Sequence, residues 1–409
     1  EFRRVLFRSA LRRLSALLET SPGEPRAILA SARLLQTDGR AAEAAGLLAR
    51  LDPAGLPRDM LMDALLLRAS LAAQLGMHDE ERRAIDDALA IDPYCWPARL
   101  QLGSLLERGG RPKEAARTYR DALRIGPPRG YRPASHVDAF EHAERVAVQY
   151  AEALELALEQ SVSSLPAYSD RWREAASILA GRTKPFLSQS NRLAVPRLPA
   201  QPFFRREAFP WVAALEARTD AIRAEMLAAF KDQGADFEPY IQYRPGEPVN
   251  QWAELNNSSR WSTYHLIRAG EPVQKNLARC PQTAAALGGI DSVRLEGLCP
   301  NVMFSVLAPK TRIPPHHGES NARLVAHLPL VVPQGCWFRV GYDYRLWKEG
   351  EVLIFDDTIE HEAANESDQL RVVMIFDVWN PYLSIEERAL VQRLSQVERG
   401  FREDASPNG

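Results

Sequence analysis

Histidines gather in one short stretch of this chain. Four of the eight histidines, at 316, 317, 327 and 361, lie within 46 residues. His316 is in a proline-bounded loop after a predicted strand, and His361 follows the run FDDTIE at the end of another. Imidazoles presented from neighbouring strand ends are a common way to bind a transition metal. The spacing therefore predicts a metal site with His316 and His361 as ligands.

An arginine follows this pair. Arg371 opens the next predicted strand, ten residues after His361. Iron(II) oxygenases hold their metal from one side, commonly through two imidazoles and one carboxylate, and leave the other positions open. The far carboxylate of 2-oxoglutarate needs a permanent cation of matching shape, and a guanidinium provides that fork. We therefore expect Fe(II), 2-oxoglutarate and O2 to react here, with His316, His361 and Arg371 as the catalytic residues.

Longer motifs around these residues resemble the aspartyl/asparaginyl β-hydroxylase family. The resemblance rests on HHGESNARLVAHL at 316–328, WKEGEVLIFDDTIEHE at 347–362 and the stretch 371–381 that ends FDVWNP. It covers roughly residues 185–385. It implies a jelly-roll 2-oxoglutarate oxygenase with an unusual two-histidine iron site. By position in the motifs, the residues expected to contact the cosubstrate are Ser305, His327, Arg371 and Trp261.

Two positions depart from related patterns. Gly318 stands where the common iron triad has its carboxylate, two residues after the first histidine, and the resembling family shares this glycine. Water is expected at the vacant metal position, with Asp357 orienting it. Val325 stands where the family often carries a second arginine, two residues before His327. This leaves one expected carboxylate contact without its arginine.

Each assignment has a structural alternative. His316 and His361 also fit ordinary loop histidines, and His327 fits a core histidine whose hydrogen bonds are satisfied. Arg371 also fits a structural ion pair, and the Asp356–Asp357 pair fits a simple turn. His317 is expected to be a neighbour of the metal ligands rather than a ligand.

Short β-rich runs surround the candidate residues. They are rich in β-branched and aromatic residues, as strands are. Several short strands at this spacing predict a sandwich or barrel, and a double-stranded β-helix (jelly roll) suits them. An amphipathic helix is predicted before them at 211–230. The predicted strands are 301–308, 323–332, 336–342, 351–355 and 370–378.

The N-terminal part repeats itself every 34 residues. The run ALAIDP at 88–93 recurs as ALRIGP at 122–127, and Gly76 and Gly110 precede these runs at the same offset. A less regular copy ends at 51–53. This period resembles tetratricopeptide repeats, whose paired helices stack and leave a groove. We expect the groove to bind a peptide or protein substrate, with a packing spacer as the alternative.

The remaining organisation follows from helix and proline patterns. Helix is predicted to continue over 137–158 and 172–180, and a cluster of prolines between 183 and 202 ends it. The expected fold class is a multidomain α + β protein. Its expected domains are tetratricopeptide-like repeats at 10–130, a helical bridge at 131–184 and the oxygenase jelly roll at 185–395. Residues 1–9 resemble a translated sequencing adaptor, so we expect the natural N-terminus to be missing.

Composition excludes some functions. The net charge of −2 argues against broad nucleic-acid binding. The sequence has no run of eighteen apolar residues, so no membrane-spanning helix is predicted. The four cysteines form no CxxC pair, and their scarcity fits a reducing compartment, so we expect a bacterial cytoplasmic protein.

These patterns together predict a dioxygenase that hydroxylates an unactivated carbon. The substrate expected is the β-carbon of Asp or Asn in a peptide or protein. A lipid acyl chain, a free amino acid and a peptide natural product are alternatives within the same chemistry. A non-catalytic peptide-binding scaffold is the alternative of another class.

Overall fold

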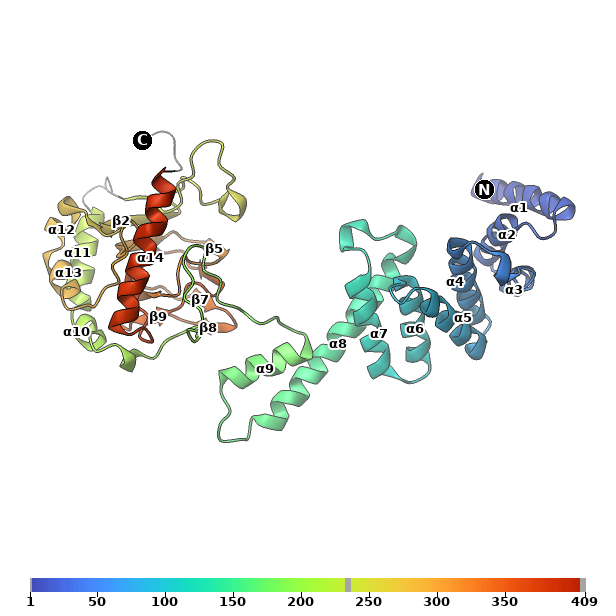
Figure 1. The fold of residues 1–409 in the computed structure, drawn as a ribbon, viewed down its shortest axis with the longest axis horizontal. Coiled ribbons are helices and arrows are strands. Elements are labelled where there is room, and N and C mark those ends of the chain that lie inside the picture. Colours follow the sequence, from blue (N-terminus) through green and yellow to red (C-terminus); the bar gives the residue numbers. More distant parts are fainter. Residues whose placement is uncertain (1, 232–236, 405–409) are drawn as a thin grey trace. The chain divides into compact units, whose positions relative to one another are not determined.

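The computed structural model describes residues 2–231 and 237–404. Glu1, the first residue of the expected adaptor segment, lies outside the described residues, and the others begin helix α1. The chain forms two compact units, one ending at Lys184 and the other beginning at Pro185 (Figure 1). The division falls at the start of the proline-rich stretch.

The first unit is an array of helical hairpins. Three hairpins pair α2 with α3, α4 with α5 and α6 with α7. Gly39, Gly76 and Gly110 join the two helices of each hairpin with φ of 78°, 71° and 73°, a conformation that only glycine adopts freely. The helices are α1 (Phe2–Thr20), α2 (Pro25–Thr37), α3 (Ala41–Leu48), α4 (Arg58–Gln74), α5 (His78–Ile91), α6 (Trp96–Arg108), α7 (Pro112–Ile125), α8 (Val137–Val162) and α9 (Asp170–Ala180).

Small residues let these hairpins pack closely. Gly103 of α6 lies against the ring of Tyr119 on α7, and a Cβ at this position would overlap that ring. Phe140 of α8 closes the last hairpin with Ala122 and Ala143, all fully buried. The tetratricopeptide-like array predicted from the 34-residue period is therefore confirmed as a helical array.

The second unit has two antiparallel sheets. The larger has the order β1-β2-β4-β11-β6-β9, with β3 on β2, and the smaller has the order β5-β10-β7-β8. The strands are β1 (Glu238–Pro239), β2 (Trp261–Arg268), β3 (Glu271–Pro272), β4 (Val302–Leu307), β5 (Thr311–His316), β6 (Arg323–Val331), β7 (Cys336–Val340), β8 (Asp343–Arg345), β9 (Leu353–Phe355), β10 (His361–Asn365) and β11 (Arg371–Trp379).

The pairing of strands β4 to β11 is nested. The first of these eight strands pairs with the eighth, the second with the seventh, the third with the sixth and the fourth with the fifth. Except for the β7–β8 hairpin, successive strands thus alternate between the two sheets, which is the topology of a double-stranded β-helix. The predicted jelly roll is confirmed.

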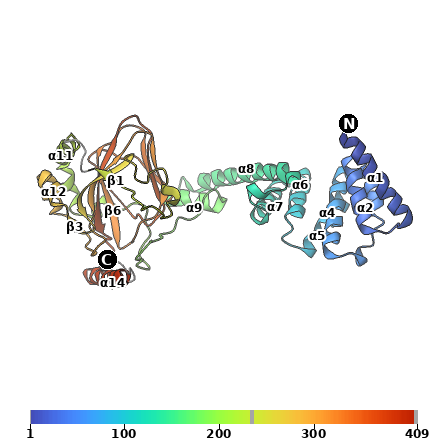
Figure 2. The same ribbon diagram turned by 90° about the horizontal axis from the view of Figure 1, so that it is seen from above.

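The two faces of the larger sheet have different partners. Even-numbered residues of β4, β6 and β11 point outward into a core with helix α11 (Thr219–Lys231). Odd-numbered residues point between the sheets. Figure 2 shows α11 and α12 on the outer side of the strands. The remaining helices of this unit are α10 (Val212–Glu216), α12 (Gln274–Arg279), α13 (Pro281–Leu287) and α14 (Ile385–Asp404).

Some elements differ from the sequence-based predictions. The single helix predicted at 211–230 is two helices, α10 and α11, separated at Ala217 and Arg218. His316 was predicted to lie in a proline-bounded loop, but Pro314 and Pro315 belong to β5, which is an edge strand and so tolerates proline. His316 is therefore the last residue of a strand. Among the described residues, none of the helices is long and apolar enough to cross a membrane.

Candidate active site

The two predicted metal ligands lie side by side between the sheets. His316 ends β5 and His361 begins β10, and the two residues are direct partners in the pairing of these strands. Their ring centroids are 4.0 Å apart, with 51° between the ring planes. His361 is 7% exposed. Strand pairing therefore brings together two imidazoles from residues 45 positions apart.

Backbone carbonyls fix the tautomer of both histidines. His316 Nδ1 is 2.8 Å from the carbonyl oxygen of Pro314, and His361 Nδ1 is 3.1 Å from that of Ile359. A carbonyl only accepts, so each Nδ1 carries the proton and each Nε2 keeps its lone pair. Burial lowers the pKa of His316 to about 4 and holds the pKa of His361 well below its usual range. Both rings are thus neutral, the form that binds a metal.

Gly318 leaves no room for a third side-chain ligand. A Cβ at this position would overlap the carboxylate of Asp357, and the Gly318 amide donates to the Asp357 carbonyl at 2.6 Å. Within residues 2–231 and 237–404, no cluster of three His, Cys, Asp or Glu side chains could hold a metal ion. The residues present fit a metal held by two imidazoles, as the resemblance implies.

Arg371 is a buried cation without an acidic partner among the described residues. Arg371 is the first residue of β11 and is 1% exposed, and its Nε has no hydrogen-bond partner within residues 2–231 and 237–404. Asp368, the nearest acidic residue before it in sequence, pairs instead with Lys310 at 3.2 Å. Burial lowers the pKa of Arg371 to about 10. Because a buried charge is costly when unpaired, this guanidinium is suited to an incoming anion.

Polar side chains surround the same space. Ser305 on β4 is fully buried and accepts a hydrogen bond from Trp261 Nε1 at 3.0 Å. His327 on β6 accepts one from Trp347 Nε1 at 3.3 Å. Burial, and to a lesser extent the charge of Arg371, lowers the pKa of His327 to about 3. These groups are all neutral hydrogen-bonding partners beside one cation.

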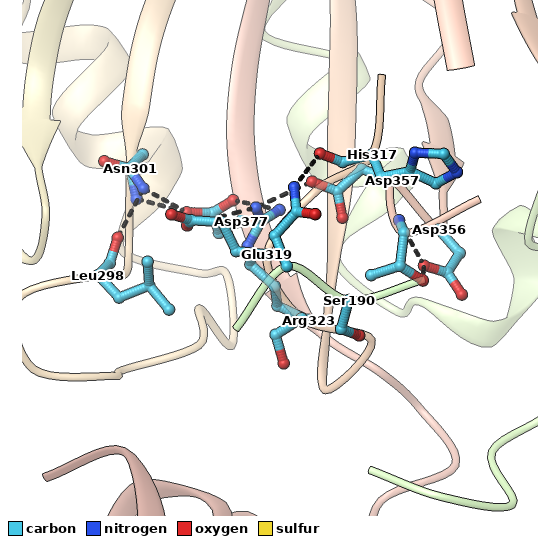
Figure 3. A network of polar contacts seen from close by, with 12 residues as sticks. Ser190, Leu298, Asn301, His317, Glu319, Arg323, Asp356, Asp357 and Asp377 are labelled. Carbon is cyan, nitrogen blue, oxygen red and sulfur yellow. Dashed lines mark hydrogen bonds and ion pairs between the residues drawn. The ribbon is translucent and has the colours of Figure 1, made fainter. Parts of the chain in front are cut away.

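A second arginine, Arg323, lines the same cavity. Arg323 begins β6 and contacts Asp357 at 2.9 Å and Asp377 at 3.3 Å (Figure 3). Asn301 donates its backbone and side-chain N–H groups to Asp377 at 2.7 and 3.0 Å. One cation serves two buried carboxylates, and burial raises the pKa of Asp357 to about 7. Asp357 is thus tied to Arg323 rather than free in a turn.

One cavity of the second unit connects these groups. Arg323, Asp377 and Trp347 also line it, and although they stand within the quoted motifs, no role was assigned to them from the sequence. Arg323 could have been found from strand alternation, since it shares one face of β6 with Val325 and His327. The predicted site residues that line this cavity are His316, His361, Arg371, Ser305, His327 and Trp261.

Known proteins share this part of the chain. The family model for aspartyl/asparaginyl β-hydroxylase matches residues 216–381. An ornithine lipid ester-linked acyl 2-hydroxylase of Rhizobium tropici is 32% identical over 209 residues, which cover 48% of this chain and 67% of that protein. The chain belongs to the aspartyl/asparaginyl β-hydroxylase family. The resemblance read from the motifs is confirmed.

Other members of the aspartyl/asparaginyl β-hydroxylase family match different lengths. The human aspartate beta-hydroxylase domain-containing protein 2 is 32% identical over 50% of this chain and 54% of its own length. Human aspartyl/asparaginyl beta-hydroxylase is 26% identical over 77% of this chain and 38% of its own length. The match thus spans about half of the first of these relatives. A solved prolyl-4-hydroxylase of Pseudomonas putida is 12% identical over 41% of this chain and 99% of its own, with a TM-score of 0.26.

Proposed function

We propose that the second unit is an Fe(II)- and 2-oxoglutarate-dependent dioxygenase that hydroxylates an unactivated carbon. The observation that carries this proposal is the juxtaposition in one cavity of two neutral imidazoles and one buried guanidinium that has no acidic partner in the part of the chain the structure describes. His316 and His361 would hold the metal through Nε2. Arg371 would bind the far carboxylate of 2-oxoglutarate, with Ser305 and His327 as hydrogen-bonding partners.

The residues of this chain would bind and orient the reacting groups, and they would keep water out of the cavity. The carbonyls of Pro314 and Ile359 hold the two imidazoles in the tautomer that presents Nε2. Trp261 orients the Ser305 hydroxyl by donating to its oxygen, so that the Ser305 proton is available to an anion. The aromatic rings of Phe338 and Phe355 pack around His361 and keep its side of the cavity apolar.

Bound Fe(II), together with 2-oxoglutarate and O2, supplies the oxidising power, and the products are succinate, carbon dioxide and the hydroxylated substrate. The oxidation is the chemistry of iron, 2-oxoglutarate and O2, whereas the protein chain determines which carbon of the substrate is presented to them. Arg323, Asp357 and Asp377 also line this cavity, and as a polar wall they would face a substrate bound there.

We propose the β-carbon of Asp or Asn in a peptide or protein as the target, in keeping with the description of the family. The groove of the helical array would bind the flanking polypeptide. A lipid acyl chain is the second candidate, because one relative is named an acyl 2-hydroxylase.

A turnover assay tests the proposal. The full chain, loaded anaerobically with Fe(II), is supplied with 2-oxoglutarate and O2, and succinate is measured with and without Asp- or Asn-containing peptides or ornithine-lipid micelles. We expect succinate formation that His361→Ala abolishes. Stimulation by peptide or by lipid identifies the substrate class. A chain that binds neither Fe(II) nor 2-oxoglutarate is a non-catalytic scaffold, and the proposal is then wrong.

A further inference from the structure

Trp347 contacts two of the three groups that the proposed function assigns to the cosubstrate pocket, His327 and Arg371. It lies between β8 and β9, is 5% exposed, and stacks on Phe338 with centroids 5.2 Å apart and 16° between the planes. Its indole Nε1 is 3.3 Å from Nδ1 of His327. The Cζ atom of Arg371 is 4.9 Å from the centroid of its ring. One rigid side chain therefore bridges the imidazole and the guanidinium.

The contact with His327 determines a tautomer. An indole N–H only donates, so Nδ1 of His327 must accept and cannot carry the proton. A neutral imidazole then carries its proton on Nε2. His327 is 6% exposed and lines the same cavity as Arg371. With this tautomer, His327 offers a donor, whereas the opposite tautomer would offer a lone pair that repels a carboxylate.

The contact with Arg371 determines an orientation. A guanidinium with no acidic partner among the described residues is free to turn toward any polar group. The face of the Trp347 ring attracts its positive charge through the ring quadrupole. Phe338, stacked on Trp347, prevents the indole from rotating away. The guanidinium is thus held in place without an anion that would compete with a ligand.

We propose that Trp347 is a positioning residue that prepares the pocket for a dicarboxylate, by fixing the His327 tautomer with a proton on Nε2 and by holding Arg371 in place. This inference rests on the proposed function, since it assigns a role within the same pocket. It adds a residue whose effect on the cosubstrate passes through two others. The two parts can be separated, because phenylalanine keeps a ring face but has no N–H group.

The first test measures affinity for 2-oxoglutarate. The full chain is loaded with Zn(II), which does not react, and titrated calorimetrically. We expect Trp347→Phe to weaken binding about tenfold. This is the effect of losing about one hydrogen bond, the one that His327 Nε2 donates to the anion. Trp347→Leu, which also removes the aromatic face, should weaken it further. Trp379→Phe is the matched control, since Trp379 is also buried, packs under Arg388 at 5.5 Å and lies outside the cavity lining.

A double substitution tests whether the effect passes through His327. In a His327→Ala background, Trp347→Phe should cost little further affinity, because the tautomer that it disturbs is gone. Equal losses in both backgrounds would overturn this part of the proposal. A loss of affinity in Trp379→Phe as large as in Trp347→Phe would show a general packing effect and overturn it as well.

The second test does not depend on any ligand. Nitrogen-15 NMR of metal-free protein labelled at histidine reports which ring nitrogen carries the proton, and His327→Ala assigns the signal. We expect the Nε2–H form in the parent and a mixture of tautomers in Trp347→Phe. An Nδ1–H form in the parent contradicts the inference. If the parent shows the expected tautomer but does not bind 2-oxoglutarate, the proposed function fails while the role of Trp347 in fixing the tautomer stands.

Discussion

Replacing Arg371 by methionine should make the ligand-free protein more stable while removing its affinity for 2-oxoglutarate. Burial lowers the pKa of Arg371 to about 10, from a usual value of about 12.5, which corresponds to about 3 kcal/mol lost from stability at neutral pH. The sign follows because the folded state binds this proton more weakly than the unfolded chain does. Methionine also loses the contact with the Trp347 ring, worth about 1 kcal/mol.

The net expectation for Arg371→Met is a gain of about 2 kcal/mol, or a rise in Tm of about 4–8 °C for a domain of this size. The affinity for 2-oxoglutarate should fall by about 2–5 kcal/mol, as when a charge-assisted pair loses one partner. Arg371→Lys should restore binding in part, since lysine keeps the charge but not the planar fork. Differential scanning calorimetry of the metal-free chain and anaerobic titration of the Fe(II)-loaded chain measure the two effects.

Arg339→Met is the control for this experiment. Arg339 is buried to a similar degree but contacts Glu362 at 2.5 Å and Glu360 at 2.9 Å, and it lies outside the cavity lining. Removing it takes a partner from acidic residues, so the Tm should fall. If Arg371→Met also has a lower Tm than the parent and binds 2-oxoglutarate unchanged, Arg371 is a structural residue and the cosubstrate assignment is wrong.

Burial lowers the pKa of His327 to about 3. As the pH falls below about 6.5, this imidazole therefore takes up a proton only in the unfolded chain. The folded state should lose about 2 kcal/mol of stability from this residue by pH 5. His327→Gln should therefore show a smaller fall in Tm between pH 7 and pH 5 than the parent, and an equal fall would contradict the assignment. Gly318→Ala should lower the Tm by the equivalent of about 1–3 kcal/mol, because its Cβ overlaps the Asp357 carboxylate; an unchanged Tm would show that the loop yields easily. Gly103→Ala, whose Cβ overlaps the Tyr119 ring, should destabilise the helical array by a similar amount, measured as an earlier loss of helical circular dichroism on heating.

Strong local patterns made much of the fold predictable. The apolar run of β6, the β-branched run of β11 and the 34-residue repeat are local sequence patterns that favour one structure without help from distant residues. Strand β10 escaped prediction because its sequence HEAAN has no β-branched residue, and pairing with β5 and β7 overrides that weak preference. The break between α10 and α11 likewise lies in a segment with continuous helical periodicity.

The convergence of His316 and His361 could be predicted, because each histidine stands in a motif of its own. Contacts between side chains on different strands could not be predicted from the sequence. That Arg323 meets Asp377 depends on the register of β6 against β11, and nothing in either segment specifies that register alone. The role of Trp347 depends in the same way on two partners, 20 and 24 residues away in sequence, that share no pattern with it.

The nested pairing of the eight jelly-roll strands also sets the loop that must close for each part of the site to form. Along the chain, 7 residues separate the partners 338 and 345, 26 separate 327 and 353, 45 separate 316 and 361, and 68 separate 305 and 373. The entropy lost on closure grows with each of these lengths. The order of increasing cost therefore runs from the β7–β8 hairpin, through the two imidazoles, to the closure of β4 on β11 that sets Ser305 near Arg371. Loop-closure cost alone would let a folding chain bring the two imidazoles together before it completes the pocket around Arg371, so that under the proposed function a metal can bind before the cosubstrate.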